Sequence, residues 1–153
     1  MSAKPALVAA AVGAALAATL TLPAARALEK PGTVQITDAE TKHTHLDAGK
    51  RGTSIGDLDV YSMALFNKRI TPKSIGHGAM VCTRVGTKRQ SCTANYVLPR
   101  GEIAVQGTID SRLIYELAVV GGSGLYNNVR GTLTVTSLDR KPNRELLVFR
   151  LVV

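Results

Sequence analysis

After its first thirty residues, almost every segment of this chain has the pattern of a β-strand, and no stretch of useful length has the helical period. Residues 34–38 and 102–109 alternate between apolar and polar side chains, as strands with one buried face do. The expected strands are residues 34–38, 57–66, 76–84, 92–98, 102–109, 112–120, 131–138 and 145–152. Turn residues such as Pro99-Arg100-Gly101 separate them. Eight sequential strands with short turns predict an all-β domain, either an up-and-down barrel or a sandwich.

The N-terminus has the pattern of a secretory signal peptide. Lys4 gives a short positive start, residues 6–22 are almost wholly apolar, and Ala25-Arg26-Ala27 fits the small-x-small cleavage pattern. An uncleaved membrane anchor is the alternative, but the apolar run is short for a span. We expect cleavage of residues 1–27, which leaves a single domain over residues 28–153. We also expect a secreted, extracellular location and no stable membrane insertion after cleavage.

The chain is basic, with a net charge of +8, or +6 once Lys4 and Arg26 are removed with the signal peptide. Its Lys and Arg residues are scattered over the predicted turns, where solvated charges are common. Aromatic residues make up only 4% of the chain, and no stacking platform for bases is visible. We therefore expect no nucleic-acid partner.

Two cysteines, Cys82 and Cys92, lie in strand-like runs on either side of a polar hairpin loop at residues 85–90. Export implies an oxidising compartment, so a disulfide between them is expected. Facing positions on paired strands can meet disulfide geometry. A redox Cys-x-x-Cys motif is excluded, because nine residues separate the two cysteines.

Some expected strands are apolar on both faces, most clearly residues 113–120. A small closed barrel needs an interior filler or a ligand, while its outer face normally meets water. A second apolar face is then best covered by another subunit, because large exposed apolar patches are rare on monomers. We therefore expect a homo-oligomer.

Motifs for metal binding and nucleophilic catalysis are weak. His43, His45 and Asp47 share one side of an extended segment and could contribute to a zinc or iron site, but a solvated polar strand end accounts for them better. Ser123 lies among glycines without the strand–elbow–helix context of a nucleophile, since a strand follows it. The same glycines lack the helix start that a phosphate loop needs. We expect no metal and no cofactor.

Carboxyl and phenol groups on apolar strand faces are the strongest candidates for chemistry. Asp38 shares a face with Val34 and Ile36, and other such residues are Asp57, Asp59, Tyr61, Tyr96 and Tyr115. An Asp buried beside apolar walls would have a raised pKa and could act as an acid. The alternative is that the aspartates cap strand ends in water and that Tyr115 is a core residue.

The stretch LAVVGGSGLY at residues 117–126, followed by Val129-Arg130-Gly131, resembles the V-V-G-G-T-G-x-F and A-R-G motifs of plant dirigent proteins. These belong to the allene oxide cyclase barrel superfamily. Residues 98–107 and the paired-cysteine hairpin resemble exported bacterial members. The resemblance covers roughly residues 33–138.

This resemblance implies an eight-stranded antiparallel up-and-down β-barrel, often trimeric, with an apolar lumen and no cofactor. Allene oxide cyclases steer a ring closure, and dirigent proteins guide stereoselective coupling. The Arg of the dirigent motif maps onto Arg130, and the resemblance implies that Arg130 lies towards a cavity. An acid near the first strand of dirigent proteins could correspond to Asp38. Dirigent proteins also carry an acid in the glycine corner, where this chain has Leu125, so the match to their chemistry is incomplete.

The sequence thus favours a secreted barrel that binds a hydrophobic small molecule and steers its cyclisation or stereoselective coupling, as a cofactor-free isomerase or cyclase. Asp38, Tyr61, Tyr96 and Arg130 are the candidate catalytic residues. Asp or Tyr would donate protons, and Arg130 would hold negative charge. The alternatives are a non-catalytic extracellular ligand-binding or interaction barrel, and a structural secreted barrel that is packed shut. We expect a dimer or trimer.

Overall fold

The protein was analysed as a computed structural model that describes residues 30–49, 51–67, 73–110, 113–140 and 143–153. The expected signal peptide, residues 1–27, lies outside the described residues. Within these ranges, no helix has the length and apolar character needed to cross a membrane.

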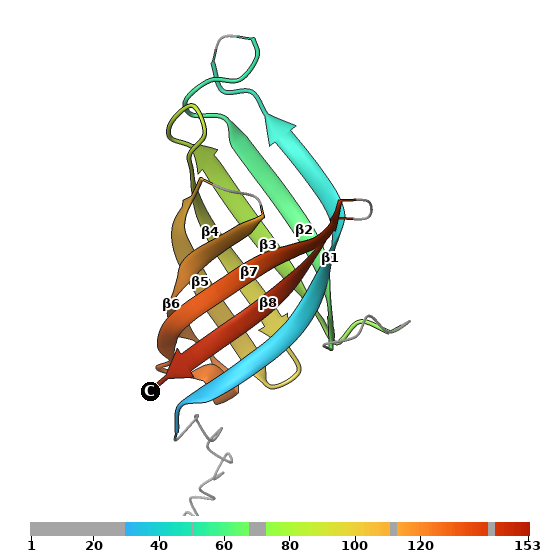
Figure 1. The fold of residues 1–153 in the computed structure, drawn as a ribbon, viewed down its shortest axis with the longest axis vertical. Coiled ribbons are helices and arrows are strands. Elements are labelled where there is room, and N and C mark those ends of the chain that lie inside the picture. The colour runs from blue at the N-terminus through green and yellow to red at the C-terminus, as the bar shows by residue number, and fades with distance from the viewer. Residues whose placement is uncertain (1–29, 50, 68–72, 111–112, 141–142) are drawn as a thin grey trace, which may run out of the picture.

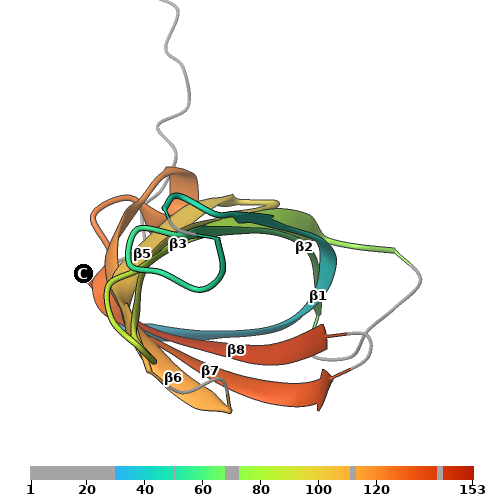
Figure 2. The ribbon, with the colours of Figure 1, turned by 90° about the horizontal axis from the view of Figure 1, so that it is seen from above.

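Eight antiparallel strands close into one barrel, in which each strand pairs with the next along the chain and β8 pairs with β1 (Figures 1 and 2). The strands are β1 (Gly32–Leu46), β2 (Leu58–Asn67), β3 (Gly76–Arg84), β4 (Gln90–Leu98), β5 (Gly101–Ile109), β6 (Ile114–Gly122), β7 (Arg130–Arg140) and β8 (Asn143–Val152). A single turn of 3₁₀-helix, η1 (Gly124–Tyr126), lies between β6 and β7. The expectation of an eight-stranded antiparallel up-and-down barrel is confirmed.

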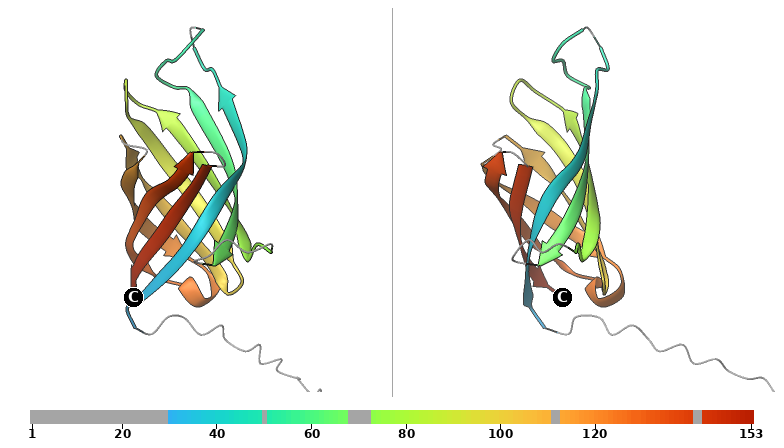
Figure 3. Two further views of the ribbon diagram at one scale, coloured as in Figure 1. Left: turned by 45° about the vertical axis from the view of Figure 1, so that its right-hand side comes forward. Right: turned by 90° about the vertical axis from the view of Figure 1, so that its right-hand side faces the viewer.

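The two ends of the barrel differ in what they carry. At the end that we call the open end, connections join β1 to β2, β3 to β4, β5 to β6 and β7 to β8. The other end, which we call the closed end, carries η1 and the C-terminus (Figure 3). The β1–β2 connection projects beyond the strands and, seen from above, lies over part of the ring (Figure 2).

Large apolar side chains fill the interior towards the closed end. Leu65, Ile103, Leu133 and Phe149 are all fully buried. The ring of Tyr96 meets that of Phe149 edge-on, with centroids 5.4 Å apart. This half of the barrel is a packed core, which follows from the alternation of apolar residues along β4 to β8.

The glycine corner at residues 121–126 belongs to the closed end. The backbone N–H of Leu125 donates to the carbonyl of Arg100 (2.8 Å), and that of Ser123 donates to Glu102 (2.9 Å). Gly124 has a φ of 61°, a conformation that favours glycine. The corner is therefore fastened to the turn between β4 and β5.

Strand β1 is much longer than the expected residues 34–38, because its ladder with β2 continues to the pair Leu46 and Leu58. A bulge interrupts this ladder between Glu40 and Lys42. A bulge adds one residue, so it reverses which side chains face inward beyond it. After the bulge His43 lies opposite Tyr61.

The hairpin of β3 and β4 places Cys82 directly opposite Cys92, and the two form a disulfide. This confirms the expected bridge. Both cysteines are buried inside the barrel wall.

Candidate functional site

A cavity of about 530 Å³ occupies the interior of the open end, within the usual size range of small-molecule sites. It runs from exposed rim residues such as Leu113 to buried ones such as Met63. Its described lining comprises Asp38, Glu40, Tyr61, Met63, Met80, Cys82, Gln90, Ile109, Leu113, Tyr115, Ser137, Asn143 and Glu145. All eight strands or their ends contribute, so the site is built on the barrel wall itself.

Asp38 is the most deeply buried acid of the lining, with 2% of its surface exposed. Its Oδ1 accepts a hydrogen bond of 3.0 Å from the backbone N–H of Glu145, and its buried Oδ2 has no partner among the described residues. Burial, reinforced by the charge of Glu145, raises the pKa of Asp38 from its ordinary 3.8 to about 8. Asp38 therefore holds its proton at neutral pH.

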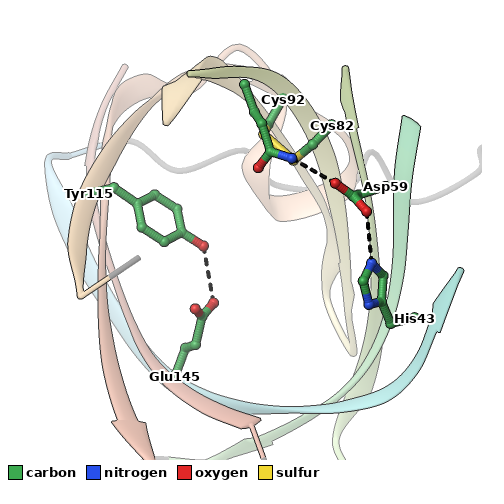
Figure 4. The surroundings of a disulfide bond; sticks show 7 residues. His43, Asp59, Cys82, Cys92, Tyr115 and Glu145 are labelled. Carbon is green, nitrogen blue, oxygen red and sulfur yellow. Dashed lines mark hydrogen bonds and ion pairs between the residues drawn. A yellow bond between two sulfur atoms is a disulfide. The ribbon is translucent and has the colours of Figure 1, made fainter. Parts of the chain in front are cut away.

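A second carboxyl group lies next to Asp38 on the neighbouring strand. Oε2 of Glu145 accepts a hydrogen bond of 3.1 Å from the hydroxyl of Tyr115 (Figure 4). Burial, and then the charge of Glu145, raises the pKa of Tyr115, so this phenol stays protonated and remains a donor. Asp38 and Glu145 thus form a pair of neighbouring carboxyl groups in different environments, an arrangement that suits paired acid and base roles.

Across the lumen, Asp59 organises a separate polar network (Figure 4). Its Oδ1 accepts hydrogen bonds from Nε2 of His43 (3.0 Å) and Nδ1 of His45 (2.9 Å), and its Oδ2 accepts one of 2.6 Å from Nε2 of Gln90. Burial opposes the charge of Asp59, yet the hydrogen bonds from His45, His43 and Gln90 outweigh it and lower its pKa. An ionised Asp59 therefore fixes the orientation of the Gln90 amide at the cavity wall.

Tyr61 connects this network to the cavity. It lines the lumen, and its ring stacks on that of His43 with centroids 4.5 Å apart and planes within 6°. The network therefore holds the Tyr61 ring in one orientation against the lumen.

The structure brings two of the four candidate catalytic residues, Asp38 and Tyr61, to the cavity. Tyr96 lies in the core with 1% of its surface exposed, where burial raises its pKa. It does not line the described cavity, but its charge interaction with Asp38 shows that it is near that carboxyl.

Arg130 does not meet the cavity, contrary to the implication of the family motif. It is the first residue of β7, at the closed end, whereas the cavity residue of β7 is Ser137, near the other end of the strand. Its exposed side chain donates from Nη1 to the carbonyl of Val129 (2.9 Å). The glycine corner therefore positions Arg130 away from the lumen.

The histidine pair has a different role from the metal ligation considered above. His43 and His45 bind Asp59, while Asp47 accepts hydrogen bonds from the backbone of Gly49 and Gly52 in the adjoining loop. No group of three or more His, Cys, Asp or Glu in the described part of the chain is arranged to hold a metal ion.

Sequence reasoning did not select Glu145 or Gln90 as site residues, and it named Tyr115 as a phenol on an apolar strand face without choosing it as a catalytic residue. Glu145 begins the inward series of β8 that continues with Leu147 and Phe149, so its face could have been read from the alternation. The same applies to Gln90 at the start of β4. Their convergence on one cavity depends on strand pairing, which the alternation does not give.

The protein is thus a closed eight-stranded β-barrel with a cavity at one end that is lined by carboxyl, phenol and apolar groups. Residues 33–149 match the model of the allene oxide cyclase barrel-like domain, and the chain belongs to this family. No curated protein matches the sequence significantly.

Several solved structures have the same fold. A pyocyanin demethylase is 25% identical with a TM-score of 0.67, and the match covers 79% of this chain and 100% of that one. A pterocarpan synthase dirigent protein is 13% identical with a TM-score of 0.61, covering 80% and 83%. An exo-specific intermolecular Diels–Alderase is 13% identical with a TM-score of 0.63, covering 79% and 97%. The latter two identities are so low that they show the shared fold alone.

Proposed function

We propose that this protein is a secreted barrel that binds a hydrophobic small molecule in its open end and promotes its cyclisation or stereoselective coupling without a cofactor. The observation that carries this proposal is Asp38, a buried carboxyl group that lines the cavity and holds its proton at neutral pH. Such a group can donate a proton to a substrate oxygen as that oxygen gains charge.

In the proposed reaction, Asp38 transfers its proton to a carbonyl oxygen of the ligand while the π bond between this oxygen and its carbon breaks and the electron pair of that bond moves to the oxygen. A nucleophilic group of the same ligand then forms the new bond to the electron-poor carbon. Glu145 accepts the proton that this nucleophile loses, and Tyr115 orients Glu145 through its hydrogen bond. Proton exchange with solvent restores both carboxyl groups.

The two tyrosines selected from the sequence have supporting roles in this proposal. Tyr61 lines the lumen, and its ring is held in place by stacking on His43. Tyr96 packs behind the site with Phe149 and keeps water away from Asp38. The activities named for the similar structures all act on small organic molecules, which supports a small-molecule substrate.

We further propose export by the signal peptide and assembly into a homo-oligomer. The disulfide between Cys82 and Cys92 supports an oxidising location. Mass analysis of the protein recovered from culture medium tests cleavage after Ala27, and sedimentation of the same sample measures the number of subunits.

The catalytic proposal is tested with a p-quinone methide that carries a pendant hydroxyl group, whose ring closure is followed by loss of absorbance. Purified wild-type protein should accelerate the reaction and enrich one enantiomer. Asp38→Asn should lower the rate by roughly 10²–10⁴-fold, the usual contribution of a general acid. Ser137→Ala, which alters the same lining without removing an acid, should retain most of the rate. Equal rates for wild type and Asp38→Asn would contradict the proposal, and binding without acceleration would favour a non-catalytic barrel.

A further inference from the structure

Gln90 is the polar side chain on an otherwise apolar part of the cavity wall. The described lining that comes from β3, β4 and β5 consists of Met80, Cys82, Gln90 and Ile109. In the closed ring of eight strands, β4 lies four strands from β8, which carries Glu145. Gln90 and Glu145 both lie near the start of their strands, at the open end. They therefore face each other across the lumen.

Asp59 determines which end of the Gln90 amide points away from it. An ionised carboxylate can only accept hydrogen bonds. Its Oδ1 accepts from His43 and His45, and its Oδ2 lies 2.6 Å from Nε2 of Gln90. A reversed amide would place two acceptors against each other. The amide nitrogen therefore faces Asp59, and Oε1 of Gln90 takes the other position.

This amide oxygen still needs a donor. Gln90 is only 8% exposed, and among the described residues no group donates to its Oε1. Buried polar atoms in folded proteins almost always have a partner. Because Gln90 lines the cavity, a group bound in the lumen can supply that partner.

We infer that Gln90 is a specificity-determining residue that accepts a hydrogen bond from a hydroxyl group of the ligand, an inference that rests on the proposed small-molecule function. The amide oxygen is a neutral acceptor with the apolar neighbours Met80 and Ile109, so a neutral hydroxyl suits it better than a cation, which would lose its hydration there. The proposed reaction places a carbonyl oxygen beside Asp38. The ligand is then an apolar molecule with a carbonyl group at one end and a hydroxyl group at the other.

The inference is tested with p-hydroxybenzylideneacetone and p-methylbenzylideneacetone, which share a carbonyl group and an aromatic body and carry a hydroxyl or a methyl group of similar size. Calorimetric titration of the purified protein gives the ratio of their two affinities. In Gln90→Met, the preference for the hydroxyl probe should fall about fivefold relative to wild type, as for the loss of one hydrogen bond. The two probes also differ in hydrophobicity, but this difference is the same for both proteins and cancels in the comparison.

Two further variants complete the test. Gln106→Met makes the same substitution at an exposed position of β5 and should leave the ratio at its wild-type value. Gln90→Met takes a donor from the Asp59 carboxylate, which could impair folding. The double variant Asp59→Asn, Gln90→Met leaves no unpartnered charge and should show the same fall in preference.

The outcomes separate this inference from the proposed function. An unchanged ratio in the Gln90 variants, or an equal fall in Gln106→Met, would overturn the inference, while the proposed function would stand on the separate assay of Asp38→Asn. A fall confined to the Gln90 variants, without any acceleration of the quinone methide reaction, would support the hydroxyl contact and contradict the proposed catalysis. Binding of neither probe to wild type would overturn the inference.

Discussion

Glu145 acts on Asp38 in two opposite ways: its backbone N–H donates a hydrogen bond of 3.0 Å to Oδ1 of Asp38, while its carboxylate raises the pKa of that residue. The hydrogen bond favours ionisation, but burial and the neighbouring charge outweigh it, and the pKa of Asp38 reaches about 8. The pairing of β1 with β8 produces this arrangement, because Asp38 lies directly opposite Glu145 in the ladder.

The raised pKa of Asp38 predicts a pH-dependent stability difference. The native state holds the Asp38 proton between pH 3.8 and about 8, whereas the unfolded state has lost it, so this residue lowers stability increasingly as pH rises through that window. Asp38→Asn removes the effect. The free energy of unfolding of Asp38→Asn minus that of wild type should therefore increase by up to about 1.4 kcal/mol per pH unit across the window. Urea unfolding at several pH values measures it, with Ser137→Ala as a non-titrating control. A difference that does not change with pH would contradict the prediction.

Removal of the Tyr115 hydroxyl should weaken the site without dismantling it. Tyr115→Phe keeps the ring and leaves Oε2 of Glu145 without its 3.1 Å donor. We expect a stability loss of about 1.5–3 kcal/mol, as for hydrogen bonds to charged groups. Turnover in the quinone methide assay should fall, but less than in Asp38→Asn. A fall as large as that of Asp38→Asn would assign the main proton transfer to Tyr115 instead.

The Asp59 network should be sensitive to loss of its charge. In Asp59→Asn, one of the two acceptor oxygens is replaced by an amide donor, so either Gln90 or the histidine pair loses its acceptor. The expected cost is about 1–3 kcal/mol of unfolding free energy. Because the pKa of Asp59 is lowered, its contribution is present above pH 3.8 and is lost as pH falls through the native pKa. The variant should therefore approach wild-type stability in acid. Asp47→Asn, in an exposed loop, serves as the control, and an equal loss in both variants would contradict the prediction.

The disulfide should stabilise the wall beside the cavity. Cys82 and Cys92 are 10 residues apart in sequence, a short loop. The double variant Cys82→Ser, Cys92→Ser should lose about 2–3 kcal/mol. Urea unfolding of wild type with and without reductant gives the matched comparison, because the reduced wild type should resemble the variant. No change on reduction would mean that the paired strands alone maintain the hairpin.

Arg130 should matter little to the chemistry. Its exposed side chain lies at the closed end and contacts the carbonyl of Val129. Arg130→Ala should change stability by ~0.5 kcal/mol or less and leave the quinone methide reaction at its wild-type rate. A large loss of rate with normal folding would place Arg130 in the reaction after all.

The strands and their faces could be predicted because alternation with period two is a property of the sequence itself. The inward faces of Asp38 and Tyr96 follow from their apolar neighbours, and the facing cysteines follow from the hairpin. The glycine motif identified the family, but it also implied that Arg130 lies towards the cavity, and Arg130 lies at the closed end instead. Motif similarity does not say at which end of a barrel the lumen is hollow.

The environment of His43 could not be predicted, because it depends on one bulge. Strict alternation from Asp38 would turn Lys42 inward, whereas the irregularity after Glu40 turns His43 towards Tyr61 instead. The cavity at the open end could not be predicted from the sequence either. It depends on how the volumes of side chains from all eight strands add up across the lumen.

The barrel separates a packed end from a hollow one, and this division has an evolutionary consequence. Side chains such as Leu133 and Phe149 maintain the fold at one end, while cavity residues such as Ser137 lie at the other end of the same strands. Substitutions of lumen side chains outside the Asp59 network, the Tyr115–Glu145 hydrogen bond and the disulfide can therefore accumulate with little loss of thermodynamic stability. A scaffold of this kind can diverge towards new substrates while its folding determinants stay constant.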